Sequence, residues 1–181
     1  MKKNRRKKKN VINPVECAER AASVVNGAED LDGKLDYSPA SLELLDRVLF
    51  LSNDLNPVIQ LMFVTDIGFY YGEVLVRNLS GEWKQVSGRE AKYTDFQWYV
   101  RLDCGGGDGA MMFPFNTVWS RLREPNTKSS LAAQYKIAAT SVETMKSKPD
   151  DLAEALRSQP MPDGSKLNVW NGEPEPVGGA A

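Results

Sequence analysis

The sequence predicts an α+β protein in which a small antiparallel β-sheet packs against several helices. Apolar residues recur at helical spacing in the first half of the chain and again near its end. Between about residue 82 and residue 113 they alternate with polar residues instead, around a glycine-rich turn. Helices, then strands, then helices is the order of an α+β fold rather than of alternating βαβ units. The length of 181 residues suggests one domain.

The two ends of the chain differ from its middle. Residues 1–13 are expected to form a disordered basic arm, 14–158 the α+β domain, and 159–181 a flexible tail rich in proline and glycine. The arm contains seven basic residues, which are Lys2, Lys3, Arg5, Arg6, Lys7, Lys8 and Lys9. The rest of the chain contains 16 basic and 24 acidic residues and so has a net charge of −8.

Two helices are expected before residue 54. The first covers 14–25 and begins at Pro14, a residue that is favoured in the first turn because its missing N–H has no partner there anyway. The second begins at Ser38 as N-cap with Pro39 in the first helical position, and its apolar pattern ends near Asn53.

A long third helix is expected from Asn56 and Pro57 to about Leu79, with Gly81 as its C-terminal cap. It is apolar nearly all round, which is typical of a helix buried inside the domain.

The period then changes to that of strands. A short strand is expected over 83–86, and a half-buried strand over 96–104, where apolar and polar residues alternate strictly. The glycines of 105–109 form the turn, and 110–113 returns as the hairpin partner. A phosphate-binding loop is the less favoured interpretation, because such a loop needs a helix immediately after its glycines.

Helices close the domain. Asn116 is expected to cap a short helix, a longer one covers about 128–148 with one apolar face, and a last short one covers 150–157.

Two patterns on the long helix bear on function. Asp66 and Glu73 lie seven residues apart and hence near one face, where paired carboxylates can perform acid–base chemistry. The favoured alternative is a structural one in which Glu73 pairs with Arg77 at i, i+4. Gly68 and Gly72 are expected to let a neighbouring element approach closely.

The chain contains no histidine and only two cysteines, so no metal site, cofactor or catalytic residue is predicted. The aromatic residues between 69 and 119 should mostly be core. A predicted partner-binding surface comprises Tyr70, Glu73 and Arg77 on the long helix and Tyr99 on the polar face of the strand.

Three segments resemble a widespread family of uncharacterised bacterial domains. They are 35–46, which resembles that family's opening helix, 68–83, which resembles its central helix and following tryptophan, and 113–122, which resembles its late strand-to-helix corner. Ser130 and Leu131 resemble the start of its closing helix. Ser80 departs from the pattern, since a glycine is expected there. The resemblance implies that family's fold but little about function, since most members are domains of unknown function and some look like immunity proteins of toxin systems.

The sequence therefore predicts a non-enzymatic protein-interaction module, with an immunity protein bound to a toxin partner as the specific hypothesis. An acidic body suits a basic partner. The alternative hypothesis is a nucleic-acid- or ribosome-associated protein that is tethered by the basic arm. A third hypothesis is an enzyme that uses Asp66 and Glu73. A cytoplasmic location without membrane contact is expected, because charges interrupt the long apolar helix and Pro14 and Glu16 interrupt the segment after the arm.

Overall fold

The computed structural model describes residues 12–27, 33–52, 55–105, 109–123 and 130–147. Four expectations fall wholly or largely on residues outside these ranges: the basic arm up to residue 11, the glycine turn over 105–109, the helix over 150–157, and the tail from residue 159. The described residues form five α-helices and a three-stranded antiparallel sheet, which confirms the α+β class.

The first three helices are α1 (Pro14–Asn26), α2 (Ser41–Leu51) and α3 (Pro57–Leu79). At the starts of α1 and α3 the side chain of an asparagine, Asn13 or Asn56, accepts a hydrogen bond from the backbone two residues later, and proline follows it.

The predicted start of α2 is wrong by two residues. Ser38 and Pro39 lie in a turn before the helix, and α2 begins at Ser41. The Ser38 hydroxyl still accepts a hydrogen bond from the Ser41 backbone amide at 3.3 Å. The predicted capping contact of Ser38 is therefore present, but it lies in the turn that precedes α2.

The cap of α3 also differs from the prediction. Ser80, not Gly81, holds the left-handed conformation that ends the helix, with φ 55° and ψ 43°. Gly81 instead begins β1, where a Cβ would lie 2.8 Å from a methyl group of Val100. Its lack of a side chain therefore serves packing rather than capping.

The sheet has the order β1-β2-β3, with β1 at Gly81–Gln85, β2 at Trp98–Asp103 and β3 at Gly109–Met112. Trp83 pairs with Val100, and Val100 with Met112, so these side chains share the face that packs on α3. The middle strand is shorter than the predicted 96–104. Val100 and Leu102 are buried and Asp103 is exposed, as the alternation predicts, but Tyr99 on the other face is buried too. A short 3₁₀ helix, η1 (Glu90–Lys92), lies in the connection between β1 and β2.

Two helices follow the sheet, α4 (Pro114–Arg123) and α5 (Leu131–Ser147). Asn116 lies inside α4 rather than at its cap, because the helix already begins at Pro114. On α5 the Ser130 hydroxyl accepts a bond from the Ala133 amide and so caps the helix, whose predicted apolar face is confirmed by the burial of Leu131 and Val142.

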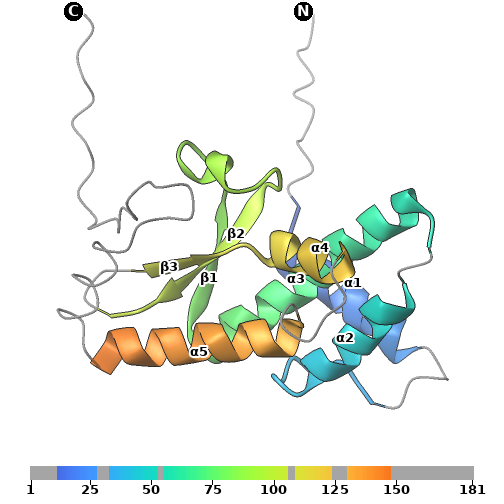
Figure 1. The fold of residues 1–181 in the computed structure, drawn as a ribbon, viewed down its shortest axis with the longest axis horizontal. Helices are drawn as coiled ribbons and strands as arrows, with labels where there is room; N and C mark the ends of the chain where they lie inside the picture. The colour runs from blue at the N-terminus through green and yellow to red at the C-terminus, as the bar shows by residue number, and fades with distance from the viewer. Residues whose placement is uncertain (1–11, 28–32, 53–54, 106–108, 124–129, 148–181) are drawn as a thin grey trace, which may run out of the picture.

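Helix α3 is the centre of the fold and packs against α1, α4, α5, β1 and β2. Figure 1 shows the sheet toward one end of the molecule and α1 and α2 toward the other, with α3 running between them. Of the described helices, α3 alone is long and apolar enough to cross a membrane, yet more than half of that stretch is buried inside the protein. The burial is typical of a core helix, but it does not extend to the first two turns, where Val58, Leu61 and Met62 are exposed.

Candidate functional site

The predicted partner-binding residues do not form one exposed surface. Tyr70 is fully buried, Glu73 is 3% exposed and Tyr99 is 8% exposed, so the expected exposure of Tyr99 is wrong. Only Arg77 has a substantially exposed side chain, at 41%. Tyr99 also lies on the face of the sheet opposite to that packed on α3. A direct contact of all four residues with one partner is therefore not available in this structure.

Three of these residues instead connect α3 to its neighbours. Glu73 accepts one hydrogen bond from Trp83 Nε1 at 2.8 Å and one from Arg77 Nε at 3.0 Å. The Arg77 guanidinium lies 3.7 Å from the centre of the Tyr37 ring, which stacks on Tyr70. The i, i+4 pairing predicted for Glu73 is confirmed, and the cluster is structural because its charges are compensated inside it.

Asp66 and Glu73 do not meet as a carboxylate pair. Asp66 faces α1, where it forms an ion pair with Arg20 at 2.6 Å. Glu73 instead contacts Trp83 of β1 and Arg77, one turn further along α3. Both carboxylates are thus engaged with separate arginines.

Tyr99 is buried on the outer face of the sheet because an aromatic side chain covers it. The alternation of the strand does not predict this contact. The ring of Phe113 lies 5.9 Å from that of Tyr99 and 6.1 Å from that of Tyr93, centre to centre. Burial removes water from the Tyr99 phenol and raises its pKa.

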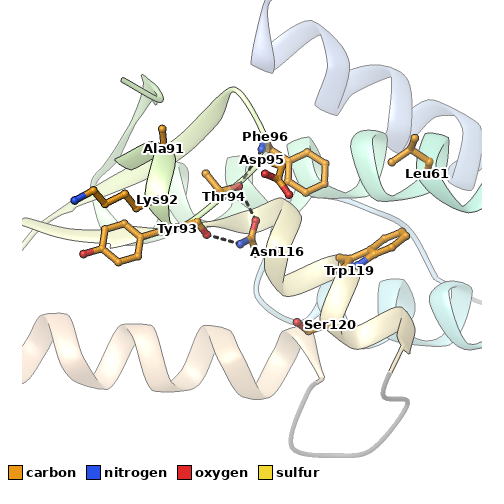
Figure 2. A pocket seen from close by; sticks show the side chains of 10 residues that line it. All are labelled: Leu61, Ala91, Lys92, Tyr93, Thr94, Asp95, Phe96, Asn116, Trp119 and Ser120. Carbon is orange, nitrogen blue, oxygen red and sulfur yellow. Dashed lines mark hydrogen bonds between the residues drawn. The ribbon is translucent and has the colours of Figure 1, made fainter. Parts of the chain in front are cut away.

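A different feature is a better candidate for a binding site. An open groove of about 630 Å³ lies between the segment 91–96, helix α4 and the start of α3. Figure 2 shows its walls, with Trp119 and Leu61 on one side and Tyr93 and Lys92 on the other. We call this feature the α4 groove. It is lined by Leu61, Ala91, Lys92, Tyr93, Thr94, Asp95, Phe96, Asn116, Trp119 and Ser120.

Asn116 holds the two walls of the α4 groove together. Its side-chain amide donates to the backbone oxygen of Tyr93 at 2.8 Å, and its side-chain oxygen accepts from the Thr94 hydroxyl at 2.7 Å (Figure 2). The Thr94 hydroxyl also accepts from the Phe96 amide at 3.1 Å. Phe96 stacks in turn on the buried ring of Phe115, with centres 4.9 Å apart. The groove is thus formed before any ligand arrives.

The lining of the α4 groove combines apolar and polar groups. Leu61 is 51% exposed and Trp119 is half-buried, with the Arg123 guanidinium 5.2 Å from its ring. Asp95 and Lys92 stand exposed at the opposite wall. Apolar anchors beside a polar rim are the usual composition of a protein-binding surface. Sequence reasoning missed this site because its residues come from three distant segments.

The described residues contain no cluster of three or more histidine, cysteine, aspartate or glutamate side chains that could hold a metal ion. Cys17 and Cys104 are not joined in a disulfide. In comparisons with protein-family models, curated proteins and solved structures, the chain matches none of them. The family resemblance of the three sequence segments therefore stays a prediction.

Proposed function

We propose that the protein is a non-enzymatic interaction module that binds a segment of a protein partner in the α4 groove. The observation that carries the proposal is the preformed groove, whose far wall is fixed to α4 by the two hydrogen bonds of Asn116. Preorganised walls lower the entropic cost of binding. Trp119 and Leu61 offer an apolar anchor site, and the rim offers Lys92 and Asp95 as polar contacts.

The charge of the chain indicates which partners suit the groove. Beyond the seven basic residues of the arm, the chain carries a net charge of −8, which steers basic proteins toward it and repels acidic ones. An immunity protein that occupies a basic toxin is the specific form of this proposal. The engagement of Asp66 and Glu73 with separate arginines supports a binding role over acid–base catalysis.

A blocking substitution in the groove tests the proposal. A photo-activatable cross-linking residue at Ser120, an exposed position in the groove, identifies the partner in the source cell. The purified partner is then titrated calorimetrically against Ser120→Arg and against Thr140→Arg, which changes an exposed position on α5. We expect Ser120→Arg to weaken binding by about tenfold or more, because a long charged side chain occupies the groove, and Thr140→Arg to leave it unchanged. Equal affinities for the two variants, at equal melting temperatures, would reject the groove as the binding site.

The nucleic-acid alternative depends on Lys2, Lys3, Arg5, Arg6, Lys7, Lys8 and Lys9, which lie outside the described residues, and it stays a prediction. Its test is the dependence of binding on salt. Affinity for duplex DNA or RNA carried by the arm falls steeply between low and physiological salt.

A further inference from the structure

Three aromatic rings line the α4 groove, and each is supported by a side chain that does not line it. The pairs are Tyr93 with Phe113, Phe96 with Phe115, and Trp119 with Arg123. The ring centres of the first two pairs are 6.1 and 4.9 Å apart, and the guanidinium of the third lies 5.2 Å from the ring centre. The rings are therefore held in place, and their remaining surface is available to a ligand.

The groove also contains a carboxylate without a counter-charge. Asp95 is exposed, and its side chain forms no hydrogen bond or ion pair within the described part of the chain. By contrast, Asp46 and Asp66 each pair with an arginine, at 2.9 and 2.6 Å. Asp95 adjoins Phe96 in the sequence, and both line the groove together with Trp119 (Figure 2). The groove thus combines aromatic rings with an unpaired negative charge.

This combination of groups suits an organic cation. The π-electrons of an aromatic face attract a cation that lies above the ring. A carboxylate adds an ion pair and charge-assisted hydrogen bonds. Arginine fits such a site better than lysine, because its planar guanidinium stacks on rings and donates parallel hydrogen bonds to one carboxylate. Its methylene stem can pack against an apolar side chain, and Leu61 supplies one in the groove.

We propose that the α4 groove binds an arginine side chain of its partner. Asp95 is the counter-charge, and the rings of Phe96 and Trp119 contact the guanidinium and its stem. The inference rests on the proposed function and names the partner chemistry that the groove selects. Asp95 is then a residue that determines specificity, because the rings alone accept neutral apolar groups as well.

The charges of the molecule identify the competing assignment. Outside the arm the chain carries a net charge of −8, which attracts a basic ligand. Lys92 also lines the groove, and its side chain forms no ion pair among the described residues. An acidic side chain of the partner at Lys92 is therefore the alternative to an arginine at Asp95. Removing each charge in turn distinguishes the two.

An NMR titration of the full chain tests the proposal. The probe is Nα-acetyl-arginine amide, whose side chain carries its only charge. The citrulline analogue is the matched neutral probe, and the glutamate analogue tests the competing assignment. The variant Asp95→Asn removes the negative charge at almost constant volume, and the matched control Lys92→Gln removes the positive charge from the same groove. Both side chains are exposed, so equal melting temperatures are expected and are checked.

We expect the natural chain and Lys92→Gln to bind the arginine probe at least about fivefold more tightly than the citrulline probe. Asp95→Asn should lose about fivefold of the affinity for arginine and none of that for citrulline, because it keeps the rings and loses the counter-charge. The shifted signals should include the indole N–H of Trp119, which lines the groove.

Three results would overturn the inference. Equal affinities for arginine and citrulline, or an unchanged arginine affinity of Asp95→Asn, would show that the groove does not recognise the charge. Tighter binding of glutamate that is lost in Lys92→Gln would assign the groove to an acidic side chain. No shift of the Trp119 indole signal up to about 50 mM arginine probe would mean that the rings do not receive a cation.

The purified partner separates this inference from the proposed function. If Ser120→Arg weakens partner binding and Asp95→Asn does not, the groove is the binding site but does not recognise an arginine. If the arginine probe binds the groove while Ser120→Arg leaves the affinity for the partner unchanged, the partner binds elsewhere and the proposed function fails.

Discussion

Two glycines on the middle of α3 determine how closely aromatic rings approach that helix. A Cβ on Gly68 would lie 2.3 Å from the Phe115 ring, and one on Gly72 would lie 2.1 Å from the Trp83 ring. Both rings are held by further aromatic contacts, so neither can withdraw without disturbing its neighbours. The predicted packing role of both glycines is confirmed.

We therefore expect Gly68→Ala to lower the free energy of unfolding by about 1–3 kcal/mol, because the added methyl group overpacks the core. Denaturant midpoints measure the loss. In the double variant with Phe115→Leu the two changes should be less than additive, since the smaller side chain makes room for the methyl group. Strict additivity would mean that Gly68 and Phe115 do not constrain each other.

Ser80 adopts a left-handed backbone conformation that glycine adopts at no steric cost. Ser80→Gly should raise the free energy of unfolding by about 0.5–1 kcal/mol, which thermal melts can resolve. As a control, Ser87→Gly, at an exposed position where φ is negative, should be neutral or destabilising, because glycine gains freedom in the unfolded chain. A stabilisation by Ser87→Gly alone would contradict this account of the cap.

Local patterns account for the residues that could be predicted. The spacing of Glu73 and Arg77 fixes a helical pair whatever the fold, and the spacing of Gly68 and Gly72 places them on one face. The alternation predicts exposure of Tyr99, because the residues at alternate positions of the strand, Gln97, Arg101 and Asp103, are polar. Its burial depends on Phe113, which reaches it only after β3 has paired with β2.

At the scale of elements, one carboxylate connects three helices. Asp46 of α2 accepts hydrogen bonds from the Leu131 and Ala132 amides at the start of α5, at 3.0 and 3.3 Å. It also forms an ion pair at 2.9 Å with Arg121 of α4, and the two side chains are 13% and 9% exposed. Asp46 thus satisfies backbone donors that a helix start otherwise leaves without partners.

We expect Asp46→Ala to lower the free energy of unfolding by about 3–5 kcal/mol, because it leaves a buried guanidinium without its counter-charge. Asp66→Ala is the matched control, since the Arg20 of that pair is 61% exposed, and it should cost less than about 1 kcal/mol. Chemical denaturation of both variants gives the comparison. Similar losses would mean that burial does not distinguish the two ion pairs.

The elements themselves were largely predictable, and their contacts were not. Helices α1 and α3 begin where an asparagine and a proline adjoin, and the sequence around β2 alternates between apolar and polar residues, so local rules identify all three. Asn116 has the composition of a helix cap, yet its side chain serves the segment 91–96, more than 20 residues earlier. The α4 groove results from that long-range contact and was therefore not predicted.

At the scale of the whole molecule, buried tyrosine side chains make the free energy of unfolding decrease at alkaline pH. Burial raises the pKa of Tyr70 and of Tyr71, whose hydroxyl has no hydrogen-bond partner among the described residues. A raised pKa in the folded state means that the stability is fully present below the ordinary pKa of 10.0 and is lost as the pH rises above it. The unfolded chain then ionises while the folded one does not.

We expect denaturant midpoints to be level below pH 10 and to fall above it, together with the appearance of tyrosinate absorbance. Tyr71→Phe should reduce the slope of that fall, because one phenol no longer ionises in the unfolded chain. If the natural chain and Tyr71→Phe lose stability at the same rate, the burial of Tyr71 does not contribute.

Removal of residues 1–11 should leave folding unchanged. Only Met1 and Val11 in that stretch are apolar, and Asn13 and Pro14, which begin α1, are retained. The melting temperature should shift by less than about 2 °C, the equivalent of a fraction of a kcal/mol in a chain of this size. A drop of many degrees would show that the arm contributes to the fold.

The contacts of Asp46 determine how late in synthesis of the chain the packing of α2 can be completed. Its partner amides at Leu131 and Ala132 lie 85 and 86 residues further along the chain. A ribosome adds about 5–20 residues per second, so roughly 4–17 s pass between the synthesis of Asp46 and that of its partners. For most of this interval neither these amides nor Arg121, which lies 75 residues after Asp46, has been synthesised. The last described helix to be translated therefore completes the packing of one of the first.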